Sequence, residues 1–192
     1  YQYRTIKYLF AVNNDNVTKT LEEFGQFVVD RAKSNLKKGG KYGTHNTSNK
    51  LSNSLAYKLK ESRRSIQFDF FAEDYWKFLD YGVKGKASSA KAPNSPYKFG
   101  SGTGKKGGLR ASIDKWVVRK GLAGTRDKQG RFMSRKQMVS MISRSIYMKG
   151  IAETKFFRDA FETEFKKLDE NIVEKYGLDV ESFLKQTLKE IK

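Results

Sequence analysis

Residues 75–108 read YWKFLDYGVKGKASSAKAPNSPYKFGSGTGKKGG, and this stretch separates two parts of the chain with different character. It begins as an aromatic amphipathic segment and continues over 83–108 as a long loop rich in Gly, Ser and Lys. Connections in compact domains are mostly short, so a loop of this length is usually functional or disordered. The preceding residues predict a compact α+β unit, and the following residues predict helices. We therefore expect the loop and the basic helices after it to contact nucleic acid or a partner, rather than to carry out chemistry.

The residues before the loop begin with the pattern of a long helix. Apolar side chains recur at every third or fourth position over 21–36, which predicts a helix over 18–38 with one buried face. Thr20 and Glu23 have the spacing of a capping box at the start of this helix. The Gly-Gly pair that follows Lys38 fits its end, because glycine readily adopts the conformation that terminates a helix.

Alternating apolar and polar residues over 55–71 predict an antiparallel β-hairpin. The fold class that we expect is α+β, with this small sheet packed against the N-terminal helix and C-terminal helices. Helical patterns follow the loop over 109–121, 134–150 (with Ser134 and Gln137 as a capping box), 157–176 and 177–192 (with Asp179 as N-cap). The organisation predicted is one domain over 1–176 that carries a basic insertion at 83–150, followed by a separate C-terminal helix over 177–192.

Positive charge is concentrated in the middle of the chain. The whole protein has 39 basic and 21 acidic residues, a net charge of +18, and residues 82–150 hold 17 of the basic and 2 of the acidic ones. A local net charge of +15 favours a polyanion such as nucleic acid, although a solubilising face or a patch for an acidic protein has the same composition. The residues expected to contact DNA or a partner are Lys84, Lys86, Lys91, Lys98, Lys105, Lys106, Arg110, Arg131 and Arg135.

Sequence patterns of catalytic and metal sites are weak. The chain has no cysteine and one histidine, His45, in a polar loop without a nearby carboxylate. The segment 100–108 departs from the phosphate-binding loop pattern, because Lys106 stands where Ser or Thr follows the lysine. Asp114 with Glu153 and Lys155 only loosely follows the layout of metal-dependent nucleases, and the residues between them predict helix and loop. We expect no enzyme activity, no metal and no cofactor.

Apolar and aromatic side chains supply candidates for contacts between subunits. The aromatic residues within 72–81 have helical spacing and could simply pack on the hairpin, while the stripes after residue 156 could dock on this chain or on a neighbour. The candidates for a subunit interface are Tyr75, Trp76, Phe156, Phe157, Phe183 and Leu184. No stretch reaches the roughly 20 apolar residues of a membrane-spanning helix, so we expect no membrane contact.

Three short motifs follow one another along the chain: Thr47, Leu51 and Ser54; then Tyr75, Phe78 and Gly82; and then GIAETKFFRDAF at 150–161. Over roughly 17–82 and 145–175 the chain resembles the tail-completion or head–tail joining proteins of tailed bacteriophages. It departs from them at Lys155 and Asp159, where proline is common, and in its insertion at 83–145 and its extra terminal helix.

The resemblance implies a non-catalytic α+β subunit of the virion, assembled in the host cytoplasm. It implies a ring with six- or twelve-fold symmetry at the portal–tail junction, in contact with portal, adaptor and tail proteins and with the genomic DNA that passes through the channel. The basic residues of 83–150 would line that channel. The alternative is a freestanding protein that binds nucleic acid without sequence specificity, although no recognisable DNA-binding motif is present.

Overall fold

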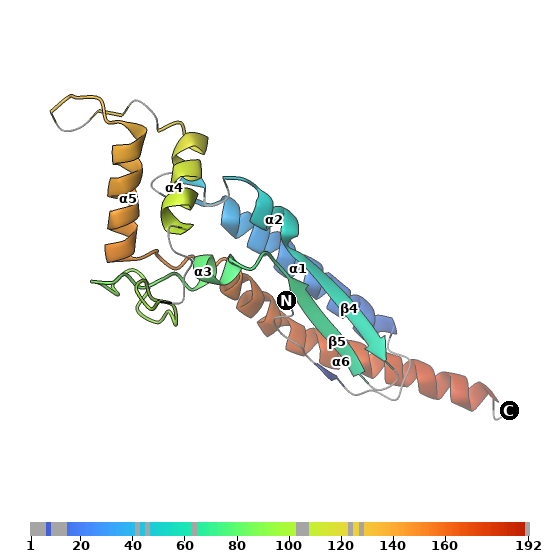
Figure 1. The fold of residues 1–192 in the computed structure, drawn as a ribbon. Helices are drawn as coiled ribbons and strands as arrows, with labels where there is room; N and C mark the ends of the chain where they lie inside the picture. The colour runs from blue at the N-terminus through green and yellow to red at the C-terminus, as the bar shows by residue number, and fades with distance from the viewer. Residues whose placement is uncertain are drawn as a thin grey trace. The chain divides into compact units, whose positions relative to one another are not determined.

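The computed structural model describes residues 7–8, 15–40, 43–44, 47–62, 65–102, 108–122, 125–126 and 129–190. The chain divides into two compact units. Unit 1 is formed by residues 1–74 and 156–192, and unit 2 by residues 75–155. Figure 1 labels helices α1 to α6 and the strands β4 and β5.

Unit 1 contains a sheet and two long helices. Strands β4 (Ala56–Ser62) and β5 (Ser65–Phe71) form an antiparallel hairpin that pairs Ala56 with Phe71 at one end and Ser62 with Ser65 at the other. The short strand β1 (Lys7–Tyr8) adds to the other edge of β5, which gives the order β1-β5-β4. Helices α1 (Asp15–Lys37) and α6 (Arg158–Glu190) pack along each other. The remaining elements are β2 (Gly39–Gly40), β3 (Gly43–Thr44) and α2 (Lys50–Ser54).

The core of unit 1 is aromatic. The Phe24 ring of α1 lies 5.7 Å from the ring of Phe68 on β5 and 5.7 Å from the ring of Phe161 on α6. Helix α1 approaches the sheet closely at Gly25, where an added Cβ would lie 2.3 Å from the Phe68 ring and 2.7 Å from the Tyr57 ring. The absence of a side chain at Gly25 therefore sets the distance between α1 and the hairpin.

The described residues of unit 2 form three helices and a long structured loop. They are α3 (Trp76–Asp80), α4 (Gly108–Arg119) and α5 (Arg135–Lys149). Helices α4 and α5 lie side by side (Figure 1) around buried Val117, Met138 and Val139. The loop after α3 carries several of the candidate site residues.

The expected α+β class is confirmed: unit 1 has the hairpin, the N-terminal helix and the C-terminal helix. The start of α5 is also as predicted, because Ser134 and Gln137 form a capping box. The predicted capping box at Thr20 is wrong. Helix α1 begins earlier, at Asp15, so Thr20 lies inside it and its hydroxyl donates to the Asn16 carbonyl at 2.9 Å.

The predicted boundary between a helix ending at 176 and a terminal helix is also wrong. Helix α6 continues without a break through Gly177. Asp179 is buried in the middle of α6, and its carboxylate accepts hydrogen bonds from the backbone N–H groups of Asn16 and Val17 at 3.3 and 3.2 Å. It therefore caps the start of α1, whose first N–H groups have no partner within their own helix.

Candidate nucleic-acid and partner interface in unit 2

Three glycines bring two distant segments of unit 2 into backbone contact. Val83 and Ile151 exchange two hydrogen bonds, of 3.0 Å from the Val83 N–H and 2.8 Å from the Ile151 N–H. A Cβ added at Gly82 would lie 2.6 Å from the Ile151 carbonyl. One added at Gly85 would lie 2.2 Å from the Met148 carbonyl, and one added at Gly150 would lie 2.3 Å from the Val83 carbonyl. We call this contact the glycine joint.

Positive φ angles also favour glycine in the joint. Gly82 has φ of +69° and Gly150 has φ of +80°, a region that side chains other than glycine rarely adopt. The end of α5 at Gly150 is thus both a helix terminus and a site of close backbone approach. Both conditions select the same residue.

The segment after the joint is anchored on α3. The Thr154 hydroxyl donates to the Leu79 carbonyl at 2.8 Å, and the Lys155 N–H donates to the Asp80 carbonyl at 3.1 Å. Lys155 has φ of +52°. Proline could make neither this hydrogen bond nor this φ angle, which gives a physical reason for a non-proline residue at this position of the chain.

The basic loop is structured over 83–102, the part of 83–108 that the structure describes before residue 108. The Lys84 N–H donates to the Tyr97 carbonyl at 2.8 Å, and the Phe99 N–H donates to the Lys84 carbonyl at 2.9 Å. Buried Ser95 donates from its hydroxyl to the Gly82 carbonyl at 2.7 Å, and the Lys86 N–H donates to the Tyr147 carbonyl at 2.9 Å. Its ends are close together and its interior is packed, as in an Ω-loop.

The loop presents its lysines in different ways. Lys86, Lys91 and Lys98 are exposed, and Lys84 is half-buried. The Lys91 ammonium donates to the Gly150 carbonyl at 3.3 Å, so Lys91 also ties the loop to the glycine joint. Lys105 and Lys106 lie outside the described residues.

The aromatic residues around α3 form a cluster with the loop. The ring of Phe78 lies 4.7 Å from the ring of Tyr97, and Tyr81 lies 6.4 Å from Tyr97. Tyr75 and Phe78 are exposed, whereas Trp76 is buried. Tyr75 therefore offers contact surface, while Trp76 is part of the interior of this chain.

Helices α4 and α5 add further cations. Exposed Arg110 lies on α4, and exposed Arg131 lies before α5. Arg135 forms a bidentate ion pair with Asp114, with its Nε 2.7 Å from Oδ1 and its second nitrogen bonded to Oδ2. This guanidinium hydrogen bond lowers the pKa of Asp114, and the carboxylate in turn raises the pKa of Arg135. Of the predicted cations, Arg135 thus has its charge partly offset.

Several exposed cations were not among the predicted contact residues. Lys115 and Arg119 are exposed on α4, and Lys136, Arg144 and Lys149 are exposed on α5. The sequence held a signal for them, because the spacing of the apolar residues along 109–121 and 134–150 leaves these charged positions on the opposite face of each helix. Counting all residues of unit 2 gives 19 basic and 4 acidic side chains, a net charge of +15, against 20 and 17 in unit 1.

The remaining interface candidates belong to unit 1. Phe156 is buried, and Phe157 is half-buried with its ring 5.2 Å from the ring of Phe70. The side chains of Phe183 and Leu184 lie outside the described residues, although their backbone belongs to α6. Phe156 is therefore a core residue and offers no surface to a partner.

The carboxylates considered for nuclease chemistry are engaged in ion pairs. Asp114 binds Arg135, and Glu153 lies 3.5 Å from the Lys155 ammonium. Within the described ranges, no three His, Cys, Asp or Glu side chains are grouped so as to hold a metal ion. His45 lies outside those ranges. In the part of the chain that the structure describes, no helix has the length and apolar character needed to cross a bilayer.

Comparison of the chain with protein-family models, with curated proteins and with solved structures finds no match.

Proposed function

We propose that this chain is a structural subunit of a tailed bacteriophage virion, placed as a ring at the head–tail junction, where it joins or completes the tail and lines the DNA passage. The observation that carries the proposal is the glycine joint. It brings together Gly82 and the segment starting at Gly150, which belong to the two distant parts of the chain that resemble head–tail joining proteins. The motif residues thus have a shared structural role in holding unit 2 together.

The charge of unit 2 supports contact with DNA that does not depend on sequence. Exposed Lys and Arg side chains on α4, α5 and the loop can neutralise phosphates, and four carboxylates cannot balance 19 cations. Contacts of this kind release counterions, so their strength falls as salt rises. A channel through which any genome sequence must pass needs this type of contact, because tight base-specific binding would arrest the DNA.

The proposal is tested in particles of a phage that encodes the chain. We expect an epitope-tagged copy to be incorporated into virions and to appear by electron microscopy as a ring of density at the head–tail junction. A variant with Phe24→Ala, which damages the core of unit 1, serves as the assembly-deficient control. Circular dichroism of the purified tagged chain establishes that the tag does not affect folding. With folding intact, virions that lack the tagged chain would contradict the proposal.

The second candidate function is a freestanding nucleic-acid-binding protein, and the same +15 unit favours it. The mass of the purified chain at low and high salt, with and without duplex DNA, separates the two. A monomer that binds DNA tightly by itself, with affinity that falls steeply with salt, supports the second function. A discrete ring, or a monomer indifferent to DNA, supports the junction subunit.

A further inference from the structure

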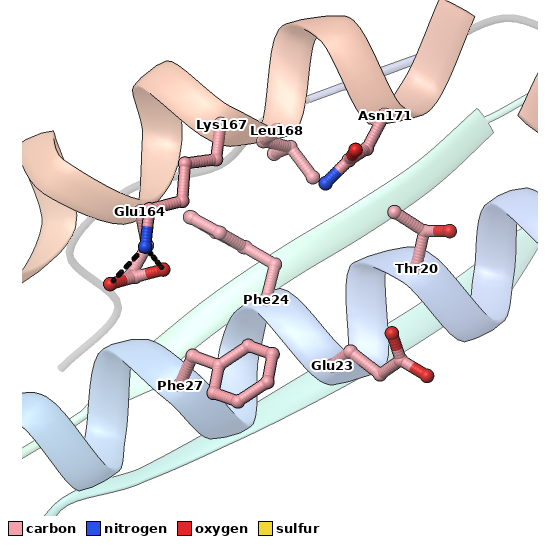
Figure 2. Close-up of a pocket in the computed structure, with 8 residues that line it drawn as sticks. All are labelled: Thr20, Glu23, Phe24, Phe27, Glu164, Lys167, Leu168 and Asn171. Atoms are coloured by element: carbon pink, nitrogen blue, oxygen red, sulfur yellow. Dashed lines mark hydrogen bonds and ion pairs between the residues drawn. The ribbon is translucent and has the colours of Figure 1, made fainter. Parts of the chain in front are cut away.

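A groove between α1 and α6 in unit 1 exposes one large apolar side chain, Phe27, next to the buried Phe24 and Leu168. Figure 2 shows Phe24 and Phe27 from α1 and Leu168 from α6 in this groove, with Thr20, Glu23, Glu164, Lys167 and Asn171 around them. Phe27 is 58% exposed, although it lies beside the buried Phe24. The volume of the groove is about 220 Å³. This is below the roughly 300–1,000 Å³ of small-molecule pockets, so one large side chain is a better match than a whole ligand.

Unit 2 carries a side chain of suitable shape in the connection between α4 and α5. Phe132 is 68% exposed, more than any other aromatic side chain among the described residues. It lies between the end of α4 at Arg119 and the start of α5 at Arg135. It pairs there with Arg126, and the Arg126 guanidinium is 3.9 Å from the centre of its ring. Exposed Arg131 precedes it. We call Arg126, Arg131 and Phe132 the aromatic tip.

The charges around the two features are opposite. Residues 15–30 of α1, which include the α1 side of the groove, hold four acidic residues and one basic residue. Glu23 is exposed at the rim, whereas Glu164 is neutralised by Arg31 at 2.8 Å and Lys167 at 3.2 Å. An approaching tip with two arginines is therefore attracted to the Glu23 side of the groove.

Charge also determines which surfaces of two copies can meet. Two units with a net charge of +15 repel each other, and two copies of the acidic half of α1 repel each other as well. A contact between unlike surfaces avoids both penalties. Contacts between unlike surfaces are the kind that build a ring, whereas a two-fold contact uses one surface twice.

We propose that the aromatic tip of one copy inserts Phe132 into the α1–α6 groove of the next copy, with Arg131 beside Glu23. The inference rests on the proposed function in that it supplies the contact between neighbours in the ring, and it names the residues of that contact. Phe132 would cover Phe27 and leave the charged rim to fix the orientation.

The absence of cysteine from the chain makes disulfide trapping a clean test. Protein with N171C, at the exposed α6 rim of the groove, is mixed with protein carrying R126C, beside the Phe132 ring, so that Phe27 and Phe132 both stay in place. Covalent dimers that form under mild oxidation are followed by non-reducing electrophoresis. Docking raises the effective concentration of the two thiols, so we expect at least about tenfold faster cross-linking than for a control pair. The control pairs R126C with V173C, because Val173 lies on α6 outside the groove and is 75% exposed.

Charge reversal tests the same contact by a second route. We expect E23K on the N171C chain to slow cross-linking, and R131E on the R126C chain to restore the rate when both are present. Equal rates for the groove pair and the Val173 pair would overturn the inference, as would reversal of either charge without effect. A chain that forms rings by mass without preferential N171C–R126C cross-linking would overturn this contact and leave the proposed function standing. Preferential cross-linking in a chain that is absent from virions would support this contact and overturn the proposed function.

Discussion

Units 1 and 2 are held together by different interactions. Unit 1 has an aromatic core in which the Phe24 ring packs against the rings of Phe68 and Phe161. The charges of its 20 basic and 17 acidic residues nearly cancel. Unit 2 has a small apolar cluster, a loop ordered by backbone hydrogen bonds, and a net charge of +15. We infer that unit 1 contributes most of the stability of the chain. Unit 2 contributes a positively charged surface whose shape is fixed by backbone hydrogen bonds.

Removal of the centre of the core of unit 1 should have the largest effect on stability. Phe24→Ala deletes a buried ring with three aromatic neighbours, and such changes cost about 3–5 kcal/mol of unfolding free energy. Phe27→Ala, three positions along the same helix, removes an exposed ring and should change the stability by less than about 0.5 kcal/mol. Urea unfolding of the two variants measures the difference. Similar losses for both would show that Phe27 is part of the core.

In unit 2 the corresponding substitution is made in the glycine joint. Gly150→Ala forces a methyl group to within 2.3 Å of the Val83 carbonyl and strains a φ of +80°. Strain and overlap together should cost about 2–4 kcal/mol. We expect hydrogen exchange to accelerate at the Val83 and Ile151 amides while the amides of β4 and β5 stay protected.

The matched control for the joint is Gly102→Ala. Gly102 has φ of +83°, but an added Cβ would lie within 4 Å of no atom in the part of the chain that the structure describes, so the strain remains, at about 1 kcal/mol. If Gly150→Ala costs no more than this control, close backbone approach is not what holds unit 2. Loss of protection in β5 with Gly150→Ala would show that the two units unfold together.

The contrast between the units also explains what the sequence could predict. The hairpin and the face of α1 were predictable because side-chain periodicity reports burial directly, and Ser134 with Gln137 identified the start of α5. The structured loop was not predictable, because backbone hydrogen bonds such as that from Lys84 to Tyr97 leave no mark on residue type. The glycines at 82, 85 and 150 mark the places where its backbone comes close to another segment.

The same reasoning applies to the candidate site. Exposed cations on α4 and α5 follow from the predicted helix faces, yet the ion pair between Asp114 and Arg135 joins residues from two helices whose packing register the sequence does not specify. Asp179 was misassigned for a similar reason. A carboxylate before an apolar stripe resembles a local N-cap, and the helix start that it satisfies lies at the other end of the sequence.

A smaller effect within unit 1 is expected from that distant cap. Asp179→Ala removes the acceptor for the Asn16 and Val17 N–H groups, and loss of an N-cap costs about 0.5–2 kcal/mol. Glu174→Ala, on an exposed part of α6, is the control. Hydrogen exchange at the first turn of α1 should accelerate with Asp179→Ala alone. If the exchange rates in the first turn of α1 do not change, the hydrogen bonds to Asp179 stabilise these N–H groups no more than hydrogen bonds to water.

The smallest effect is expected at the surface ion pair of unit 2. Because Arg135 lowers the pKa of Asp114 below its ordinary value of 3.8, the pair stabilises the fold fully above that value, and the contribution is lost as the pH falls through the lowered pKa. The difference in urea midpoint between the wild type and Asp114→Asn should therefore be constant near neutral pH, shrink in acid, and be reduced by salt. Asp30→Asn is the control, since the Asp30 carboxylate accepts from the Gln26 amide rather than from a cation. A midpoint difference that grows as the pH falls would contradict this prediction and show that the fold stabilises Asp114 in its protonated form.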